Sequence, residues 1–266
     1  MAKEFDLSGV EIRSVWEKSV HELTGNELKE VKRVVNEEGL DVCCLASPFF
    51  KCSLHRGDEY NQHLRILHKS ISAASILGAP VIRGFTFWRS RGTANWKAVE
   101  RRFREPIRIL KRERITLGIE NEPSTNASNG QLLAGFLTGL DHPSVRAIWD
   151  PCNDLSDPSG EQPFPQGYGH VRELLAHVHL KDAKRGAKKG EAEPTILGDG
   201  DLDLVGQLRA LKSDHYERYV SLETHYRPKR LDEELLRSPK GSSFSHLGSV
   251  ATRESLERLL ETLRHI

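Results

Sequence analysis

Four residues with metal-binding side chains lie at the ends of short runs of strand-forming residues. Three are carboxylates and one is an imidazole, a donor set rich in oxygen that suits Mn²⁺, Mg²⁺ or Co²⁺ and also accepts Zn²⁺. Successive members are separated by roughly one strand–helix unit. We therefore expect them to converge on one divalent metal ion. They are Glu120 in LGIENEP, Asp150 in AIWDPCND, His179 in HVHLKD and Glu223 in SLETH.

The elements that must position these residues alternate between strand-like and helix-like patterns. No linker or shift in composition interrupts the alternation, so we expect a single α/β domain over residues 1–266 with a parallel sheet. Strands are expected at residues 10–12, 42–46, 81–85, 116–120, 146–150, 178–181 and 220–223. Helices are expected at residues 26–38, 59–77, 96–114, 131–139, 171–176, 204–212 and 253–263.

The strand patterns favour a barrel over an open sheet. Both faces of a strand in an open parallel sheet meet helices and are apolar, whereas here apolar residues alternate with polar or small ones. Residues 117–120 read Leu-Gly-Ile-Glu, 177–180 read His-Val-His-Leu and 220–223 read Val-Ser-Leu-Glu. Because successive side chains point to opposite faces, each strand has an aliphatic outer side and a polar inner side. We expect a TIM-type barrel with its site at the carboxyl ends of the strands.

Composition argues against several classes of function. The 266 residues include 39 Lys and Arg against 38 Asp and Glu, a net charge of +1, which argues against binding nucleic acid through bulk charge. No apolar run approaches the roughly 20 residues of a membrane span, and no secretory signal is visible. The cysteines show neither CxxC nor zinc-finger spacing, and we expect buried, reduced thiols in a cytoplasmic protein. They are Cys43, Cys44, Cys52 and Cys152.

Five motifs, taken in order, give the chain a resemblance to a known family. GIEN, WDPCN, HVHLKD, LGDGDLD and LETH resemble segments of the xylose isomerase-like TIM barrels, the sugar phosphate isomerase/epimerase family related to ketose 3-epimerases and to inosose isomerases and dehydratases. The resemblance implies that Glu120, Asp150, His179 and Glu223 bind one metal ion, the same residues that spacing selects. It also implies that Glu120 and Glu223 are the catalytic acid/base pair.

The chemistry implied is proton transfer beside a carbonyl group. Removal of such a proton produces an enediolate, whose negative charge a divalent metal stabilises. Returning a proton to the opposite face of the same carbon is epimerisation, and returning it to the adjacent carbon is isomerisation. The expected substrate is a sugar, a keto-polyol or a sugar phosphate. The alternatives are a catalytically silent sugar-binding barrel and a metal-dependent lyase of the keto-inositol dehydratase type.

Further polar residues are candidate substrate contacts. Arg185 follows His179 where related epimerases carry an arginine that contacts a substrate oxygen; a solvated basic loop and a phosphate site are the alternatives. Lys181 lies in the same basic run, and His225 faces inward near the end of the last strand. Many relatives carry histidine at the position of Asn153, where asparagine can orient a substrate but adds no metal ligand. Other strand-end residues that either line the pocket or form polar core pairs are Glu11, Arg83 and Trp88, while His177 is expected to pack.

The N-terminal end departs from the family pattern. Similar barrels place a strand and a helix before the motif GVEIR, and here only residues 1–8 precede it. Seven strands are expected where eight close a TIM barrel, so either the first unit is missing or the barrel is incomplete with exposed edges. Because exposed edges promote association, we expect a homodimer. The related endonuclease branch, which cuts DNA, needs more metal ligands than this chain offers.

Overall fold

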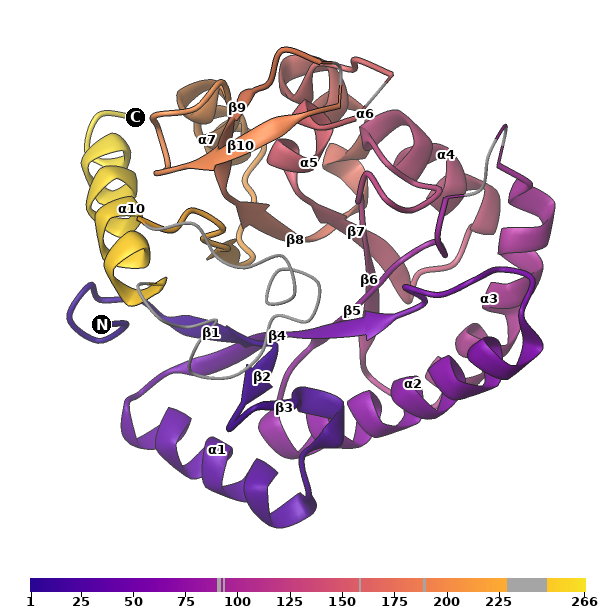
Figure 1. The fold of residues 1–266 in the computed structure, drawn as a ribbon. Coiled ribbons are helices and arrows are strands. Elements are labelled where there is room, and N and C mark those ends of the chain that lie inside the picture. The colour runs from indigo at the N-terminus through magenta and orange to yellow at the C-terminus, as the bar shows by residue number, and fades with distance from the viewer. Residues whose placement is uncertain (90–91, 93, 158, 189, 229–247) are drawn as a thin grey trace.

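Seven parallel strands form the central sheet of the protein. The computed structural model describes residues 1–89, 92, 94–157, 159–188, 190–228 and 248–266. Within this part, the sheet has the order β1-β4-β5-β6-β7-β8-β11 and curls into a nearly closed TIM-type barrel surrounded by helices (Figure 1). The strands are β1 (Gly9–Ile12), β4 (Asp41–Phe49), β5 (Val81–Gly84), β6 (Thr116–Glu120), β7 (Val145–Trp149), β8 (Leu175–Leu180) and β11 (Val220–Leu222).

Helices connect successive strands and lie outside the barrel (Figure 1). The longer ones are α1 (Gly25–Glu37), α2 (Gly57–Leu77), α3 (Trp96–Leu110), α4 (Gly130–Leu140), α7 (Leu204–Ser213) and α10 (Gly248–Leu263). Short helical turns are η1 (Val20–Glu22), α5 (Pro151–Leu155), η2 (Pro163–Gly167), α6 (Tyr168–Val171) and η3 (Arg172–Leu174). Two hairpins pair β2 (Ser14–Val15) with β3 (Lys18–Ser19), and β9 (Asp182–Arg185) with β10 (Ala192–Thr195). None of the helices described has the length and apolar character that crossing a membrane requires.

All seven expected strands are present, with shifted ends. The expected helix at residues 171–176 is wrong at its C-terminal end, because residues 172–174 form a single 3-10 turn and Leu175 already begins β8. Leu175 and Ala176 are buried in the sheet. Periodicity cannot separate a short buried strand from a buried helical segment, which explains the error.

The alternation within each strand separates two cores. Outward residues such as Leu117 and Ile119 belong to the large apolar cluster between sheet and helices. A smaller apolar cluster, separate from the first, includes Cys44, Val81 and Ile148. Gly118 is required beside it, because a Cβ there would lie 2.5 Å from Cγ1 of Ile148. The polar residues of the site lie nearer the carboxyl ends of the same strands.

Side chains bridge the edges of the sheet where no strand pairing is described. The phenol of Tyr219, just before β11, donates to Oδ2 of Asp41 at 2.7 Å, which links the last strand to β4. Near the chain ends, Arg253 of α10 pairs with Glu4 at 2.6 Å and stacks over the ring of Phe5. These contacts hold the N-terminal segment against α10 and the start of β11 against β4 (Figure 1).

Candidate metal centre

Four side chains meet at the carboxyl ends of four strands. Glu120 ends β6, Asp150 follows β7, His179 lies in β8 and Glu223 follows β11. One ligand atom from each lies within 4.8 Å of those of the other three. Glu120, Asp150 and His179 are almost fully buried, while the side chain of Glu223 is 24% exposed. The structure thus brings together the four residues that spacing selected, and we call them the tetrad.

Asn121 ties the ends of β6 and β7 together. Its side-chain amide donates to the backbone carbonyl of Asp150 at 2.8 Å and accepts from the backbone N–H of the same residue at 2.8 Å. Asn121 is fully buried, so this paired hydrogen bond is not exposed to competition from water. It fixes the spacing between Glu120 and Asp150 and links the motifs GIEN and WDPCN of this chain.

The two oxygens of Asp150 have separate partners. Oδ1 caps the short helix α5 by accepting from the backbone N–H of Asn153 at 3.1 Å, and Pro151 occupies the first helical position. Oδ2 accepts from Nζ of Lys181 at 2.5 Å. The cap therefore sets the orientation of the carboxylate and leaves Oδ2 directed into the tetrad.

Two cations neutralise the carboxylates of the tetrad. Nη1 of Arg83 lies 3.1 Å from Oε2 of Glu120 and 3.4 Å from Oε1 of Glu223. Nζ of Lys181 lies 2.5 Å from Oδ2 of Asp150 and 3.0 Å from Oε2 of Glu223. Each cation thus joins two carboxylates, and Glu223 is shared by both.

These contacts shift the pKa values of the tetrad carboxyls. Burial by itself raises the pKa of Glu120, but Arg83 and His179 lower it to about 2. Glu223 follows the same pattern: burial raises its pKa, while Lys181 is the main group that brings it well below the ordinary value. Burial dominates at Asp150 and raises the pKa of that carboxyl despite the nearby Lys181.

His179 lies between two carboxylates. Its Nδ1 lies 3.1 Å from Oε1 of Glu120, and its Nε2 lies 2.9 Å from Oε2 of Glu11. Burial lowers the pKa of His179, but Glu11 and Glu120 raise it well above its ordinary value. Without a metal ion, the imidazole is therefore held as an imidazolium.

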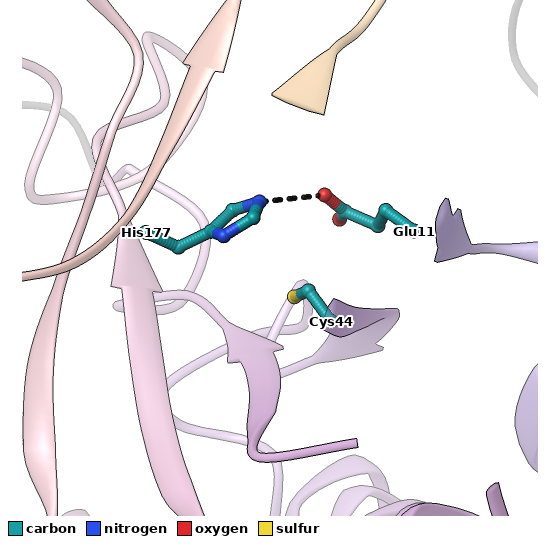
Figure 2. A group of neighbouring side chains, drawn as sticks. All are labelled: Glu11, Cys44 and His177. Carbon is teal, nitrogen blue, oxygen red and sulfur yellow. Dashed lines mark hydrogen bonds and ion pairs between the residues drawn. The ribbon is translucent and has the colours of Figure 1, made fainter. Parts of the chain in front are cut away.

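A second group of potential ligands lies beside the tetrad. Glu11 from β1, Cys44 from β4 and His177 from β8 project into the barrel and bring three ligand atoms within 4.8 Å of one another (Figure 2). Nε2 of His177 already contacts Oε2 of Glu11 at 3.1 Å and the hydroxyl of Ser221 at 2.8 Å. This group is therefore an internally bonded polar cluster in the structure.

The tetrad fits a divalent cation. It offers three carboxylates and one imidazole, a donor set that suits Mn²⁺, Mg²⁺, Co²⁺ or Zn²⁺. The ammonium of Lys181 already lies between Asp150 and Glu223, so two tetrad carboxylates are arranged around a positive charge. A metal ion at the tetrad would replace Lys181 as the cation at these two carboxylates.

Comparison with known proteins agrees with the barrel fold. Residues 1–243 match the model of the xylose isomerase-like TIM barrel family. The chain belongs to this family. A search of curated protein sequences finds no match.

Solved structures of xylose isomerase-like proteins share the fold at low sequence identity. The IolI protein with a bound zinc atom is 14% identical, with a TM-score of 0.74 over 98% of this chain and 90% of the other. The 3-keto-D-glucoside 4-epimerase YcjR from E. coli is 19% identical, with a TM-score of 0.67 over 93% and 91%. The probable 3-DHS dehydratase AsbF from Bacillus anthracis is 16% identical, with a TM-score of 0.67 over 84% of each chain.

Three of the four candidate substrate contacts lie beside the tetrad. Nδ2 of Asn153 lies 3.3 Å from Oε1 of Glu120, and Nε2 of His225 lies 3.6 Å from Oε2 of Glu223. Lys181 is buried between two tetrad carboxylates. Arg185 is exposed at the end of β9, where its guanidinium donates to Gln162 at 3.1 Å. No contact between Arg185 and the tetrad is found in the described part of the chain.

The remaining strand-end candidates divide in the same way. Glu11 and Arg83 contact tetrad residues directly, whereas Trp88 is 43% exposed at the rim. Sequence reasoning missed Arg13, which follows β1 and interacts electrostatically with Arg83 and with tetrad carboxylates. Its position immediately after the GVEI strand was the available signal, since residues at strand ends line a barrel mouth.

Replacing Lys181 by methionine will destabilise the metal-free protein, because Asp150 and Glu223 then lose the ammonium that neutralises them. Breaking a buried ion pair by removing one partner costs about 3–5 kcal/mol, and the partial exposure of Glu223 favours the lower end of that range. The measurement is urea unfolding of metal-free samples. Added Mn²⁺ will raise the melting temperature of Lys181→Met more than that of the wild type.

Lys188→Met is the matched control, because the Lys188 side chain is 84% exposed and its pair with Glu191, at 3.7 Å, lies at the surface. We expect no change in its free energy of unfolding. Equal stability of the two variants would contradict the assignment of Lys181 as the cation that neutralises these carboxylates.

Proposed function

We propose that this chain binds one divalent metal ion at the tetrad and isomerises or epimerises a sugar, a keto-polyol or a sugar phosphate. The observation that carries the proposal is the convergence of Glu120, Asp150, His179 and Glu223 within 4.8 Å at the carboxyl ends of the strands. TIM-barrel enzymes place their chemistry at this end of the barrel. Membership of the xylose isomerase-like family supports the same class of reaction.

Glu120 and Glu223 are the proposed acid/base pair. They come from β6 and from the end of β11, so they approach a bound substrate from different directions. Arg83 contacts both carboxylates through one nitrogen, which holds them near each other without joining them directly. One glutamate would remove the proton on the carbon beside the carbonyl and the other would deliver a proton, a contribution of roughly 10²–10⁴-fold to the rate.

A bound divalent ion would supply Lewis-acid stabilisation of the negative charge that develops on oxygen when this proton leaves. The tetrad would hold the ion through Glu120, Asp150, His179 and Glu223. We propose Mn²⁺, Mg²⁺ or Co²⁺, with Zn²⁺ as the alternative suggested by the zinc atom of IolI. Asn153, Lys181 and His225 would donate hydrogen bonds to substrate hydroxyls, because their polar groups border the tetrad. Arg185 remains a proposed contact for a longer or phosphorylated substrate.

A metal-dependent lyase is the second candidate. It is favoured by the likeness to a probable 3-DHS dehydratase, because elimination of water also begins with removal of a proton beside a carbonyl. Product mass separates the two reactions, since dehydration loses water and isomerisation does not.

A catalytically silent sugar-binding barrel would bind substrate without exchanging its proton.

Exchange of the substrate α-proton with solvent deuterium tests the proposed reaction. Wild-type protein loaded with Mn²⁺ will introduce deuterium into a ketose or keto-polyol in a screened set, as measured by NMR. Glu120→Gln and Glu223→Gln will each lower the exchange rate by roughly 10²–10⁴-fold, because each removes one acid/base group.

Glu122→Gln is the matched control for these variants. Glu122 pairs with Lys51 at 2.6 Å and lies outside the tetrad, so its replacement should leave exchange unchanged. Metal content is measured for every variant, so that a lost ion is not mistaken for a lost base. Exchange at the wild-type rate in metal-loaded Glu120→Gln or Glu223→Gln would rule out that residue as acid or base.

Metal binding will release protons at neutral pH. Glu11 and Glu120 keep His179 protonated in the metal-free protein by raising its pKa well above the ordinary value, and a metal ligand must be neutral imidazole. Below that raised pKa, apparent Mn²⁺ affinity will therefore fall as the pH falls, and above it the affinity will level off. Adding Mn²⁺ in weak buffer at about pH 7 should release about one proton per chain. Binding without proton release would contradict His179 as a ligand.

A further inference from the structure

Glu11 connects the wall of the barrel to the tetrad. It lies in β1, an edge strand of the sheet, and its carboxylate reaches across the barrel to β8. Its Oε2 contacts Nε2 of His179 at 2.9 Å and Nε2 of His177 at 3.1 Å (Figure 2 shows the second contact). The side chain of Glu11 is 13% exposed, and those of both histidines are 1% exposed. A single carboxylate oxygen thus receives two buried imidazoles from one strand.

The two ring nitrogens of His179 face different groups. Nδ1 lies 3.1 Å from Oε1 of Glu120 and 4.0 Å from Oε2 of Glu223, so this nitrogen belongs to the tetrad. Nε2 faces Glu11 and no other carboxylate in the described part of the chain. A metal ion among the tetrad ligands would therefore meet Nδ1, which leaves Nε2 to carry the proton.

We propose that Glu11 is a positioning residue that holds His179 in its metal-binding form. The Glu11 carboxylate accepts the Nε2–H of His179, which fixes the ring orientation and keeps the lone pair of Nδ1 directed at the tetrad. A carboxylate bound to the outer nitrogen of a metal-ligating histidine also makes that histidine a stronger ligand. This inference rests on the proposed metal centre and adds to it a residue that touches neither metal nor substrate.

His177 and Ser221 hold Glu11 in place. Nε2 of His177 contacts both Oε2 of Glu11 and the hydroxyl of Ser221 in β11, at 3.1 Å and 2.8 Å. These side-chain contacts thereby link β1, β8 and β11 across the open side of the barrel. His177 therefore supports the carboxylate that orients His179, and it precedes His179 by two residues in β8.

The other oxygen of Glu11 gives the rival interpretation. Oε1 is buried without a hydrogen-bond partner among the described residues, and Cys44 and His177 each offer a ligand atom within 4.8 Å of a carboxylate oxygen of Glu11 (Figure 2). A thiol, an imidazole and a carboxylate are ligands that Zn²⁺ accepts. If Glu11 served such a second ion, Cys44 would be needed for metal binding, whereas a positioning role makes Cys44 dispensable.

Metal affinity in Glu11→Gln tests the proposal. Metal-free protein is titrated with Mn²⁺ and, separately, with Zn²⁺, in competition with a chelator of known affinity, and circular dichroism checks the fold. We expect Glu11→Gln to bind the same number of ions as the wild type, but about 10–100-fold more weakly, as replacement of outer partners of metal ligands typically produces. Cys44→Ala is the matched control from the same cluster, and its affinity should equal that of the wild type.

NMR of the zinc-loaded wild type supplies a readout that does not depend on a variant. Long-range ¹H–¹⁵N spectra will show His179 with a metal-bound Nδ1 and a protonated Nε2. Unchanged affinity in a folded Glu11→Gln overturns the positioning role while leaving the metal centre intact. A proton on Nδ1 in the zinc-loaded protein overturns the positioning role and also the assignment of Nδ1 as the ligand atom of His179. Loss of an ion in Cys44→Ala also overturns it, in favour of a second site. A wild type that binds no ion contradicts the metal centre itself, and this inference with it.

Discussion

Four carboxylates lie close together inside the barrel, and each depends on a neighbouring positive charge. Glu120 and Glu223 share Arg83, Asp150 and Glu223 share Lys181, and Glu11 pairs with the imidazolium of His179. An uncompensated buried charge costs several kcal/mol, so these pairings are a condition for folding as well as a preparation for chemistry. They also explain why the carboxyls of Glu120 and Glu223 have lowered pKa values and remain ionised. The same negative charge that must be neutralised in the metal-free protein is what would attract a divalent ion.

The barrel produces this concentration of charge through simple geometry. Parallel strands end at one rim, and alternate residues point inward, so one polar residue per strand is enough to build a shared site. One small residue and two hydrogen-bonding side chains then fix the positions of the strand ends. Gly118 leaves room inside the sheet, Asn121 locks two strand ends together, and Asp150 both caps α5 and directs one oxygen into the tetrad. Gly118 and Asn121 act on residues of β7 and its end, whereas the cap formed by Asp150 acts on the helix that follows it.

Much of this arrangement could be predicted from the sequence, because strand ends and alternation are local signals. The seven strands and the meeting of the tetrad follow from periodicity and spacing alone. The start of β8 could not be predicted, since a buried apolar run lacks the alternation that marks a strand, and residues 175–176 were expected to be helical. Contacts between side chains that are far apart in the sequence could not be predicted either. Nothing near Glu11 indicates that its carboxylate reaches across the barrel to β8, and nothing near Arg185 indicates that it turns toward Gln162. Such contacts depend on register and loop path, which tertiary packing decides.

Anomalous X-ray scattering from crystals soaked in Mn²⁺ tests the central claim most directly, because it locates the ion without reference to activity. We expect one anomalous peak per chain, coordinated by Glu120, Asp150, Nδ1 of His179 and Glu223, with the ammonium of Lys181 displaced from Asp150. Absence of a peak among these four residues, or a peak held instead by Glu11, Cys44 and His177, would contradict the account.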